Sequence, residues 1–446
     1  MLNGREGGVV LVAPPWPRCG SSNIFANQVG AHMQGGRRVF LLLGPTERAH
    51  AASESGFWAD AVAAMSFPGA ACVDYGRTGD TMRPLITRSF YDWMVADMDD
   101  AMSIMARVAG NSRLPPSLGE FLHGHPIDVV HVNHAFEMIL GAKVAMLVSR
   151  KQGSRPLVVC DTQDVQSDAF LISGRLNPFT RRTDEGSALL RAELSLLRQA
   201  DVLVHYTKPD LDFFAQRLPA IRHELVPPAV APETEQTLRS LRGARHAISW
   251  DFVYIGNHNV GNLASVTWLL REIFPRVRAR SFRIAIVGRV AELVRRYEPQ
   301  LFAANASLFF GEVDDIAPIY SGSRIVLAPA IKGTGASIKL IEALCAGRSV
   351  IATTLTARGL PEGSSDCEAL SVCDAPDEFA AAMVTAADSP DWQKNTAAAA
   401  FYERHFSSDR YRQRMIDVID AGLSRARHLS GGSQRVSAIE QFEELT

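Results

Sequence analysis

Short continuous apolar runs alternate with longer stretches of helical spacing along most of this chain. Each run has the length of a buried strand, and the stretches between runs carry apolar residues three and four positions apart. This alternation predicts strand–helix units and parallel sheets, which is an α/β fold. The predicted strands cover residues 9–13, 38–43, 129–132, 157–160, 202–204, 251–255, 283–287, 308–313, 325–328 and 350–353.

The most informative stretch covers residues 325–360. A buried strand ends before Pro329, the turn Gly333-Thr334-Gly335 follows, and a helix opens near Ser337 and ends at Gly347. This loop leaves the carboxyl end of a strand and enters the amino end of a helix. Open α/β sheets bind ligands at such an edge, and free backbone N–H groups there attract anions.

Lys339 and Glu342 stand three positions apart on an otherwise apolar helix. One interpretation is a solvated ion pair that contributes a few tenths of a kcal/mol. The other is a binding pair, in which the cation meets a phosphate and the carboxylate meets sugar hydroxyls. The spacing alone favours the first interpretation.

The surrounding pattern changes that balance, because residues 325–360 resemble the donor-binding signature of GT-B glycosyltransferases of family 4 (group 1). The resemblance rests on Lys339, Glu342-Ala343, Gly347 and Gly359-Leu360. It implies an α/β GT-B fold with two Rossmann-like domains facing a cleft. Many members carry a first glutamate where this chain has Thr334, so the role of that glutamate does not carry over. The chain is similar to the branch with Gly-x-Gly in this loop.

The resemblance also implies an order of domains. We expect an N-terminal acceptor domain over residues 1–228 and a donor domain over 250–405. Residues 229–249 are rich in Pro, Glu, Thr and Arg and predict a linker with at most one helical turn. A helix over 406–428 is expected to return to the first domain, before a polar tail at 429–446. Residues 85–108 predict a long amphipathic helix, which we interpret as a core helix; an insertion that contacts an acceptor or a membrane is the alternative.

Further donor-binding candidates follow the strands of the second domain. A glycine at a strand end allows close approach of a ligand, and a helix starting at Asn262 offers N–H groups to phosphate. Arg289 either reaches a phosphate or base, or faces solvent. The family's Arg/Lys pair is missing from the loop at 256–262, so phosphate charge falls to Lys339, with or without another cation. The donor-site candidates are Gly256, Asn262, Gly288, Arg289, Gly311, Val313, Gly333, Thr334, Gly335 and Ser337.

Acceptor-side candidates follow the strands of the first domain. The resemblance places a histidine after the strand at 129–132, and either Asn133 or His134 fills that position; a residue that only satisfies the loop backbone is an equal alternative. Asp164 is a further candidate, with helix capping as its structural alternative. The loop residues Gly20, Ser21 and Ser22 are the remaining candidates, and a capped structural turn is their alternative.

Composition excludes several other classes of protein. The chain has 446 residues, a net charge of −2 and a pI near 6.6, which does not fit a nucleic-acid-binding surface. No G-x-G-x-x-G fingerprint indicates a dinucleotide cofactor. None of the six cysteines forms a C-x-x-C pair, and no signal peptide or membrane span is evident. These features predict a cytoplasmic protein and leave open a peripheral contact with the inner face of the membrane.

The resemblance implies a retaining, metal-independent hexosyltransferase with catalytic candidates Lys339, Glu342 and His134. Its co-substrate would be a nucleotide diphosphate sugar, with no other cofactor. The acceptor would be a glycan, a lipid-linked sugar or another small molecule, as in polysaccharide biosynthesis. Two alternatives stay open: a non-catalytic GT-B scaffold that binds a nucleotide sugar or glycan, and a nucleotide-sugar epimerase.

Overall fold

The computed structural model describes most of the chain, and the following account is confined to that part. The predicted helix at 85–108 and most of the predicted polar tail lie outside the described residues. The described residues are 7–14, 20–43, 70–75, 77–78, 112–114, 116–174, 185–242, 247–361, 364, 367–389 and 396–430.

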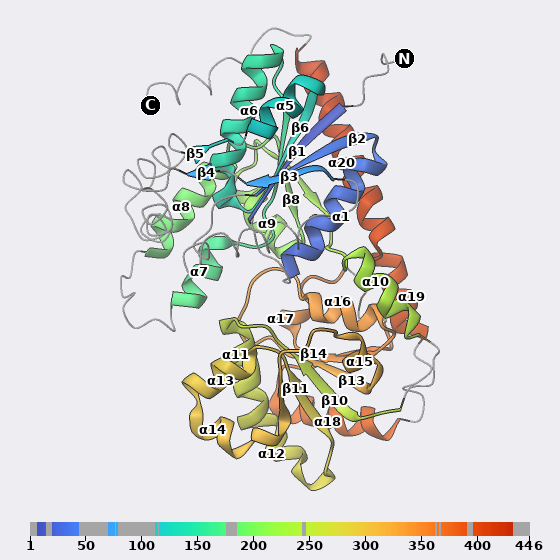
Figure 1. Cartoon of the computed structure of the whole chain (residues 1–446). Helices are drawn as coiled ribbons and strands as arrows, with labels where there is room; N and C mark the ends of the chain where they lie inside the picture. Colours follow the sequence, from blue (N-terminus) through green and yellow to red (C-terminus); the bar gives the residue numbers. More distant parts are fainter. Residues whose placement is uncertain are drawn as a thin grey trace. The chain divides into compact units, whose positions relative to one another are not determined.

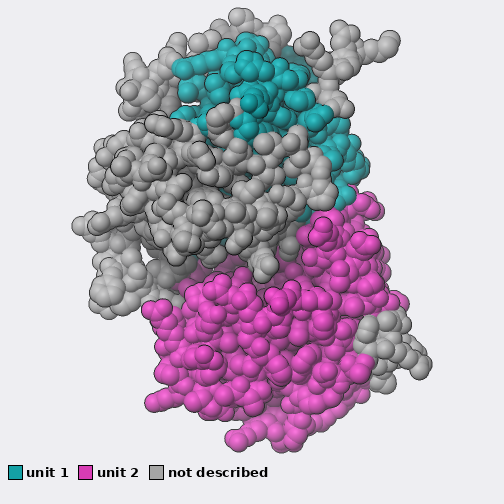
Figure 2. All heavy atoms as spheres, viewed as in Figure 1, with its two compact units in different colours: residues 1–171, 179–226, 412–446 teal, residues 172–178, 227–411 magenta. Residues whose placement is uncertain are grey.

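The chain divides into two compact units (Figure 2). Unit 1 comprises residues 1–171, 179–226 and 412–446. Unit 2 comprises residues 172–178 and 227–411. The chain therefore builds most of unit 1, then unit 2, and returns to unit 1 within its last helix, α20 (Ser408–Ser430).

Unit 1 contains a seven-stranded parallel sheet in the order β3-β2-β1-β6-β7-β8-β9. The chain order reverses beside β1: β2 and β3 extend the sheet to one side, and β6 to β9 extend it to the other. Apolar runs buried on both faces are typical of such sheets. The strands are β1 (Gly7–Ala13), β2 (Arg37–Leu43), β3 (Ala70–Tyr75), β6 (Ile127–Asn133), β7 (Leu157–Asp161), β8 (Val202–His205) and β9 (Arg222–Leu225).

Helices cover the sheet of unit 1 (Figure 1). They are α1 (Gly20–Gln34), α5 (Pro116–Gly124), α6 (Met138–Gln152), α7 (Gln166–Gly174), α8 (Glu185–Leu197) and α9 (Lys208–Arg217). A 3₁₀ turn, Ala135–Glu137, links β6 to α6. Two short strands, β4 (Arg77–Thr78) and β5 (Ser112–Arg113), pair antiparallel apart from the main sheet.

Unit 2 contains a six-stranded parallel sheet in the order β12-β11-β10-β13-β14-β15. Its chain order reverses between β10 and β13, which pair through Trp250 with Ser323 and Val253 with Val326. Loops from the carboxyl ends of these two strands run to opposite faces, which makes this the switch point of the sheet. The strands are β10 (Trp250–Ile255), β11 (Ile284–Val287), β12 (Phe309–Gly311), β13 (Ser323–Ala328), β14 (Ser349–Ala352) and β15 (Leu370–Val372).

Alternate residues of these strands enter two separate apolar cores, one on each face of the sheet. Tyr254 of β10 packs with α11, α13 and α18, whereas Val253 packs with α16 and α19 on the other face. The helices are α10 (Pro232–Ser240), α11 (Val260–Trp268), α12 (Phe274–Val277), α13 (Val290–Tyr297), α14 (Pro299–Ala304), α15 (Ala317–Ser321), α16 (Ile338–Cys345), α17 (Thr354–Ala357), α18 (Pro376–Asp388) and α19 (Thr396–His405). A π-helical turn (Leu269–Ile273) joins α11 to α12, and 3₁₀ turns cover Arg278–Arg280 and Ala306–Leu308.

The segment predicted as a linker contains a helix of nine residues, α10, rather than a single turn. Pro232 starts this helix, and its buried residues include Leu238 and the carboxylate of Glu235. Glu235 accepts hydrogen bonds from the Tyr402 hydroxyl (2.9 Å) and the Ser408 backbone N–H (3.2 Å). The polar composition of the segment hid this helix, because its glutamate is satisfied by partners from the far end of unit 2.

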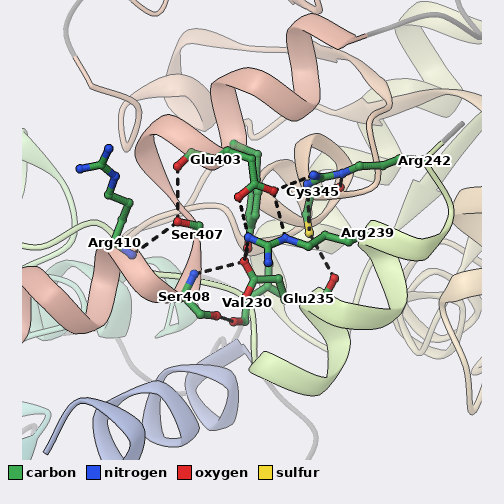
Figure 3. A network of polar contacts seen from close by, with 10 residues as sticks. Val230, Glu235, Arg239, Arg242, Cys345, Glu403, Ser407, Ser408 and Arg410 are labelled. Carbon is green, nitrogen blue, oxygen red and sulfur yellow. Dashed lines mark hydrogen bonds and ion pairs between the residues drawn. The ribbon is translucent and has the colours of Figure 1, made fainter. Parts of the chain in front are cut away.

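Arg239 of α10 and Arg242, which follows this helix, extend the contact into a polar network (Figure 3). Arg239 pairs with Glu235 at 2.9 Å and with Glu403 at 2.5 Å. Arg242 pairs with Glu403 at 2.6 Å and donates through Nε to the Cys345 carbonyl at 2.6 Å. Cys345 is the last residue of α16, where a cation compensates the negative end of the helix dipole. The network therefore anchors the carboxyl end of α16 to α10 and α19.

We predict that Glu235→Ala destabilises unit 2, because the mutation leaves the Tyr402 hydroxyl and the Ser408 N–H buried without an acceptor. The expected loss in free energy of unfolding is about 2–3 kcal/mol, or a melting temperature lower by roughly 4–12 °C in calorimetry. Glu233→Ala is the matched control, because Glu233 lies two residues earlier on the same helix and is exposed. Equal melting temperatures for the two variants would contradict the anchoring role of Glu235.

Candidate functional site

The switch point of unit 2 brings polar side chains from both faces of the sheet to one edge. Lys339 comes from α16 on one face, and Asn262 comes from α11 on the other. Tyr254 stands near the carboxyl end of β10 between them. Strand, loop and helix order explains the meeting, because α11 follows β10 directly and α16 follows β13.

The ammonium of Lys339 is held by two oxygen atoms and an aromatic ring. Its Nζ donates to the Tyr254 hydroxyl at 2.9 Å and to Asn262 Oδ1 at 2.7 Å. It also lies 4.0 Å from the centroid of the Tyr254 ring, which is a cation–π distance. The Tyr254 hydroxyl in turn donates to Asn262 Oδ1 at 2.8 Å. These bonds keep the lysine at the switch point in the ligand-free protein.

The first turn of α11 differs in one respect from the sequence prediction. The helix begins at Val260 rather than at Asn262, and Asn259 is its N-cap. The backbone N–H of Asn262 is occupied by Asn259 Oδ1 at 2.8 Å, so this N–H is not open to a phosphate. The prediction of a helix start at Asn262 is therefore wrong, and the side chain of Asn262 supplies the contact with Lys339.

Glu342 lies one turn further along α16 and bonds to a different partner. Its Oε2 accepts a hydrogen bond from the Tyr320 hydroxyl at 2.9 Å. Lys339 and Glu342 are both partly buried, and they form hydrogen bonds with Tyr254, Asn262 and Tyr320 rather than with each other. This arrangement differs from the solvated ion pair that the spacing allowed.

Burial shifts the pKa values of both Lys339 and Glu342 toward neutral pH. Desolvation lowers the pKa of Lys339 to about 7, although the nearby Glu342 carboxylate raises it in part. Desolvation likewise raises the pKa of Glu342 to about 7, against the opposing effects of the Tyr320 hydrogen bond and Lys339. A pair of groups that titrates near neutral pH beside an open loop is a candidate functional site.

Three of the predicted glycines lie side by side along the carboxyl edge of β10, β11 and β12. Gly256 donates to the Val287 carbonyl at 2.9 Å, and Gly288 donates to the Gly311 carbonyl at 2.5 Å. Gly288 has a φ of 104°, and a Cβ on it would lie 2.3 Å from the Gly256 carbonyl oxygen. Any side chain at Gly288 would therefore push this edge apart.

The glycine turn before α16 is held by an arginine that the sequence analysis did not select. Gly333 and Gly335 have φ values of 153° and 68°, and Thr334 lies between them partly buried. Arg358 donates through Nε to the Gly335 carbonyl at 2.9 Å and through Nη1 to the Gly333 carbonyl at 3.5 Å. Its sequence signal is only its place directly before the Gly359-Leu360 pair.

The remaining donor-side candidates have less distinctive surroundings. Ser337 is the N-cap residue of α16, but its side chain makes no capping hydrogen bond. The Arg289 side chain is 42% exposed and lies 3.5 Å from the Glu292 carboxylate, as in the solvent-facing alternative. Val313 is partly buried and packs against the core around α16.

In unit 1, Asn133 ends β6 inside a buried polar network. It is fully buried; its Oδ1 accepts from Gln28 (2.9 Å) and Gln163 (3.0 Å), and its Nδ2 donates to Gln28 Oε1 (2.9 Å). Next to it, Asp161 accepts from Tyr206 at 2.8 Å and pairs with His131 at 2.9 Å. The bonding capacity of Asn133 is thus used within the core, which favours His134 for the position of the family's loop histidine.

His134 and Asp164 are brought together by a residue that the sequence analysis did not select, Gln166. Its Nε2 lies 3.2 Å from His134 Nδ1 and also donates to Asp164 Oδ1. His134 has a φ of 68°, which is uncommon for a residue with a side chain, and burial lowers its pKa to about 3. The imidazole is therefore neutral at any working pH.

Two buried carboxyl groups lie near this loop and carry no sequence signal. Burial raises the pKa of Glu137 to about 8, and the described structure gives its Oε1 no hydrogen-bond partner. Burial also raises the pKa of Glu193 to about 7; this group caps α7 by accepting from the N–H groups of Gln166 (2.8 Å) and Ser167 (3.0 Å).

Gly20, Ser21 and Ser22 form the first turn of α1, which begins at Gly20.

Within the described residues, no group of three or more His, Cys, Asp or Glu side chains is arranged to hold a metal ion. In the same part of the chain, no helix combines the length and the apolarity that crossing a membrane requires.

Residues 250–389, which form most of unit 2, match the family model described as glycosyl transferases group 1. No curated protein matches the chain in sequence. The family match covers the sheet, the glycine edge and both Lys339 and Glu342. It confirms the resemblance found in the sequence.

Solved structures extend the similarity over the whole chain at low sequence identity. HepE from Anabaena, in complex with UDP and glucose, has 13% identity and a TM-score of 0.56, and covers 92% of this chain and 99% of its own. Sucrose-phosphate synthase from Thermosynechococcus elongatus has 14% identity and a TM-score of 0.61, with 96% and 100% covered. The α,α-trehalose 6-phosphate synthase from Burkholderia multivorans has 11% identity and a TM-score of 0.58, and covers 97% of this chain and 100% of its own. These similarities confirm the predicted two-domain α/β fold of the GT-B class.

We predict that Lys339→Met stabilises the ligand-free protein more at pH 6.5 than at pH 9. Below about pH 7, Lys339 is protonated in both the folded and the unfolded chain, so the full cost of desolvating the ammonium destabilises the fold. Between about pH 7 and the pKa of the unfolded chain, the folded chain releases this proton, and the cost declines as the pH rises. The expected gain in melting temperature is roughly 2–5 °C at pH 6.5 and less than half of that at pH 9. Lys332→Met is the control, because Lys332 is exposed in the same loop and its gain should not vary with pH. A gain for Lys339→Met that is the same at both pH values would exclude a buried ammonium.

Proposed function

With a GT-B fold whose unit 2 matches the group 1 glycosyl transferases, we propose that this protein is an enzyme that transfers a sugar from a nucleotide diphosphate sugar to an acceptor hydroxyl. The donor binds at the carboxyl edge of the unit 2 sheet. The observation that carries this proposal is the Lys339 ammonium, held at the switch point by Tyr254 and Asn262 beside the glycine turn.

The diphosphate interacts with Lys339 and with the backbone of the glycine turn. A phosphate oxygen replaces the neutral oxygens of Tyr254 and Asn262 as the partner of the ammonium, and the added negative charge restores the lysine proton. As the bond to the sugar breaks, negative charge grows on the leaving diphosphate, and a preorganised cation stabilises that change more than it stabilises the ground state. Glu342, oriented by Tyr320, accepts hydrogen bonds from ribose or sugar hydroxyls.

The finer points of the proposal follow from family resemblance. Transfer retains the configuration of the anomeric carbon, needs no metal ion and serves polysaccharide biosynthesis. The acceptor, a glycan, a lipid-linked sugar or another small molecule, meets unit 1 near His134 and Asp164. The protein works in the cytoplasm, and a lipid-linked acceptor would bring it to the inner face of the membrane. UDP-glucose is the first donor to test and UDP the first nucleotide, because structures of HepE contain them.

Thr334 supports a second function, that of a non-catalytic scaffold which binds a nucleotide sugar or glycan. It stands where many family members have a glutamate, so the loop lacks that charge. An enzyme releases the free nucleoside diphosphate when donor and acceptor are mixed, and often slowly with water alone, whereas a scaffold binds the donor and leaves it intact. Release of free nucleotide over hours, followed by chromatography, separates the two.

We predict that Lys339→Ala weakens UDP binding at least about tenfold and lowers turnover by about 10²- to 10³-fold, because the cation facing the leaving diphosphate is lost. Titration calorimetry measures the binding, and release of free nucleoside diphosphate measures the turnover. GDP and ADP are titrated in parallel to identify the base. Lys332→Ala removes an exposed lysine of the same loop and should change both quantities less than threefold.

Near-normal activity of Lys339→Ala would refute the phosphate assignment. Wild-type protein that binds none of the three nucleotides would refute the proposed function itself.

We also predict that donor binding takes up a proton at pH 8, where Lys339 is largely neutral in the ligand-free protein. Titration of UDP in two buffers of different ionisation enthalpy should show an uptake approaching about one proton per site. The uptake should vanish in Lys339→Met. Buffer-independent enthalpies in the wild type would show that the lysine keeps its proton throughout.

A further inference from the structure

The proposed donor site lacks positive charge in the place where it is expected. The loop between β10 and α11, residues 256–262, contains no lysine or arginine. Arg289 is the N-cap residue of α13, but its side chain is directed to Glu292 and is 42% exposed. A diphosphate carries more negative charge than Lys339 alone can balance, so another source of positive potential is needed at this edge.

Arg358 supplies such a charge from behind the glycine turn. It follows α17, which leaves the carboxyl end of β14, and β14 pairs with β13 through Ala352 and Ala328. The loop after β13 contains the glycine turn, so neighbouring strands bring the arginine and the turn together. Its Nε and Nη1 are engaged by two carbonyls of the turn, whereas Nη2 is buried with no hydrogen-bond partner in the described structure.

The two bonds determine which way the peptide groups of the turn face. In a planar trans peptide, the C=O and the next residue's N–H point in opposite directions. Because Arg358 holds the Gly335 carbonyl at 2.9 Å, the N–H of Ala336 points away from the guanidinium. Ala336 directly precedes Ser337, the N-cap of α16, so this N–H lies at the amino end of the helix. The long bond to Gly333 fixes the start of the turn.

We propose that Arg358 is a positioning residue of the donor site: its forked guanidinium holds the turn at residues 333–335 so that the backbone N–H groups face the diphosphate, and its charge adds to that of Lys339. This inference rests on the proposed function. It assigns to Arg358 part of the role that an Arg/Lys pair in the β10–α11 loop has in other family members.

The geometry separates the effect of shape from the effect of charge. Arginine presents several donors in one plane and can hold two carbonyls at once, whereas lysine offers a single charged point on a flexible chain. Arg358→Lys keeps the positive charge but cannot hold both carbonyls in the same orientation. Arg358→Met removes both. We therefore expect Arg358→Lys to resemble Arg358→Met in diphosphate binding more than it resembles the wild type.

The chain offers a matched control in Arg324. This residue lies on β13 in the same unit and also donates to two backbone carbonyls, those of Ala387 at 2.8 Å and Ser389 at 3.4 Å. It stands near the amino end of the strand, away from the glycine turn. Arg324→Met therefore removes a guanidinium that binds two carbonyls, together with its ion pair to Asp251 (3.7 Å), without touching the donor edge.

Titration calorimetry measures the affinity of the full chain for UDP, GDP and ADP, for their nucleosides and for inorganic pyrophosphate. The proteins compared are the wild type and the variants Arg358→Met, Arg358→Lys and Arg324→Met. We expect both Arg358 variants to bind the preferred diphosphate and pyrophosphate about 10- to 100-fold more weakly. Binding of the matching nucleoside, and all binding by Arg324→Met, should change less than threefold. A loss that is confined to diphosphate-bearing probes distinguishes positioning from general loosening of unit 2.

Three outcomes would overturn the inference while leaving the proposed function intact: unchanged diphosphate binding in Arg358→Met, an equal loss for the nucleoside, or full recovery in Arg358→Lys. If the wild type binds no nucleotide, the proposed function fails. Binding of pyrophosphate by the wild type and the Arg358 variants then tests the inference about Arg358. A wild type that does not bind pyrophosphate either would overturn this inference as well. If Arg358→Met does not fold, Arg358→Lys is decisive, supported by hydrogen exchange of residues 330–337, which should be faster than in the wild type.

Discussion

The candidate site depends on one constraint, the need to satisfy a lysine ammonium that is partly removed from water. A charged group in such a place is stable only with polar partners, and this chain provides a carboxamide oxygen, a phenol oxygen and an aromatic face. All three partners are neutral, so the ammonium is held without being cancelled. When the lysine carries its proton, its positive field is available to a ligand, whereas a tight ion pair with Glu342 would have cancelled this field.

The architecture of unit 2 explains why these partners meet. Lys339 belongs to a helix on one face of the sheet and Asn262 to a helix on the other, so they can touch only at the carboxyl edge, between β10 and β13. The glycines at 256 and 288 keep backbone rather than side chains along this edge. The polar network of α10 and α19 anchors the opposite end of α16. The lysine therefore stands on a helix that is braced at its far end.

Much of the fold follows from local patterns in the sequence. Apolar runs at 251–255 and 325–328 become β10 and β13 within two residues at each end, because a strand buried on both faces needs an unbroken run of apolar residues. The sequence predicts at most a single turn where α10 forms, because the partners that stabilise the buried Glu235 lie about 170 positions further along the chain. Local sequence carries no record of such partners.

The site shows the same limit. The glycine turn and the lysine have a recognisable spacing, so the sequence identifies them as candidates. Tyr254 resembles any other aromatic residue of a buried strand, and only the structure reveals that its hydroxyl meets Lys339. Arg358 lies 25 positions from Gly333 in sequence and approaches it because two strands are neighbours in the sheet. Residues that act through the arrangement of strands are invisible to spacing.

The polar network also includes a hydrogen bond between the two ends of the long segment of unit 2. The Ser408 hydroxyl donates to the Val230 carbonyl at 3.1 Å, so the point where the chain enters unit 2 adjoins the point where it leaves. A segment whose two ends meet is topologically an insertion in its host chain. Evolution can exchange such an insertion as a cassette without rethreading the host sheet. In this way one version of unit 2 can be combined with many versions of unit 1, each free to diverge on its own.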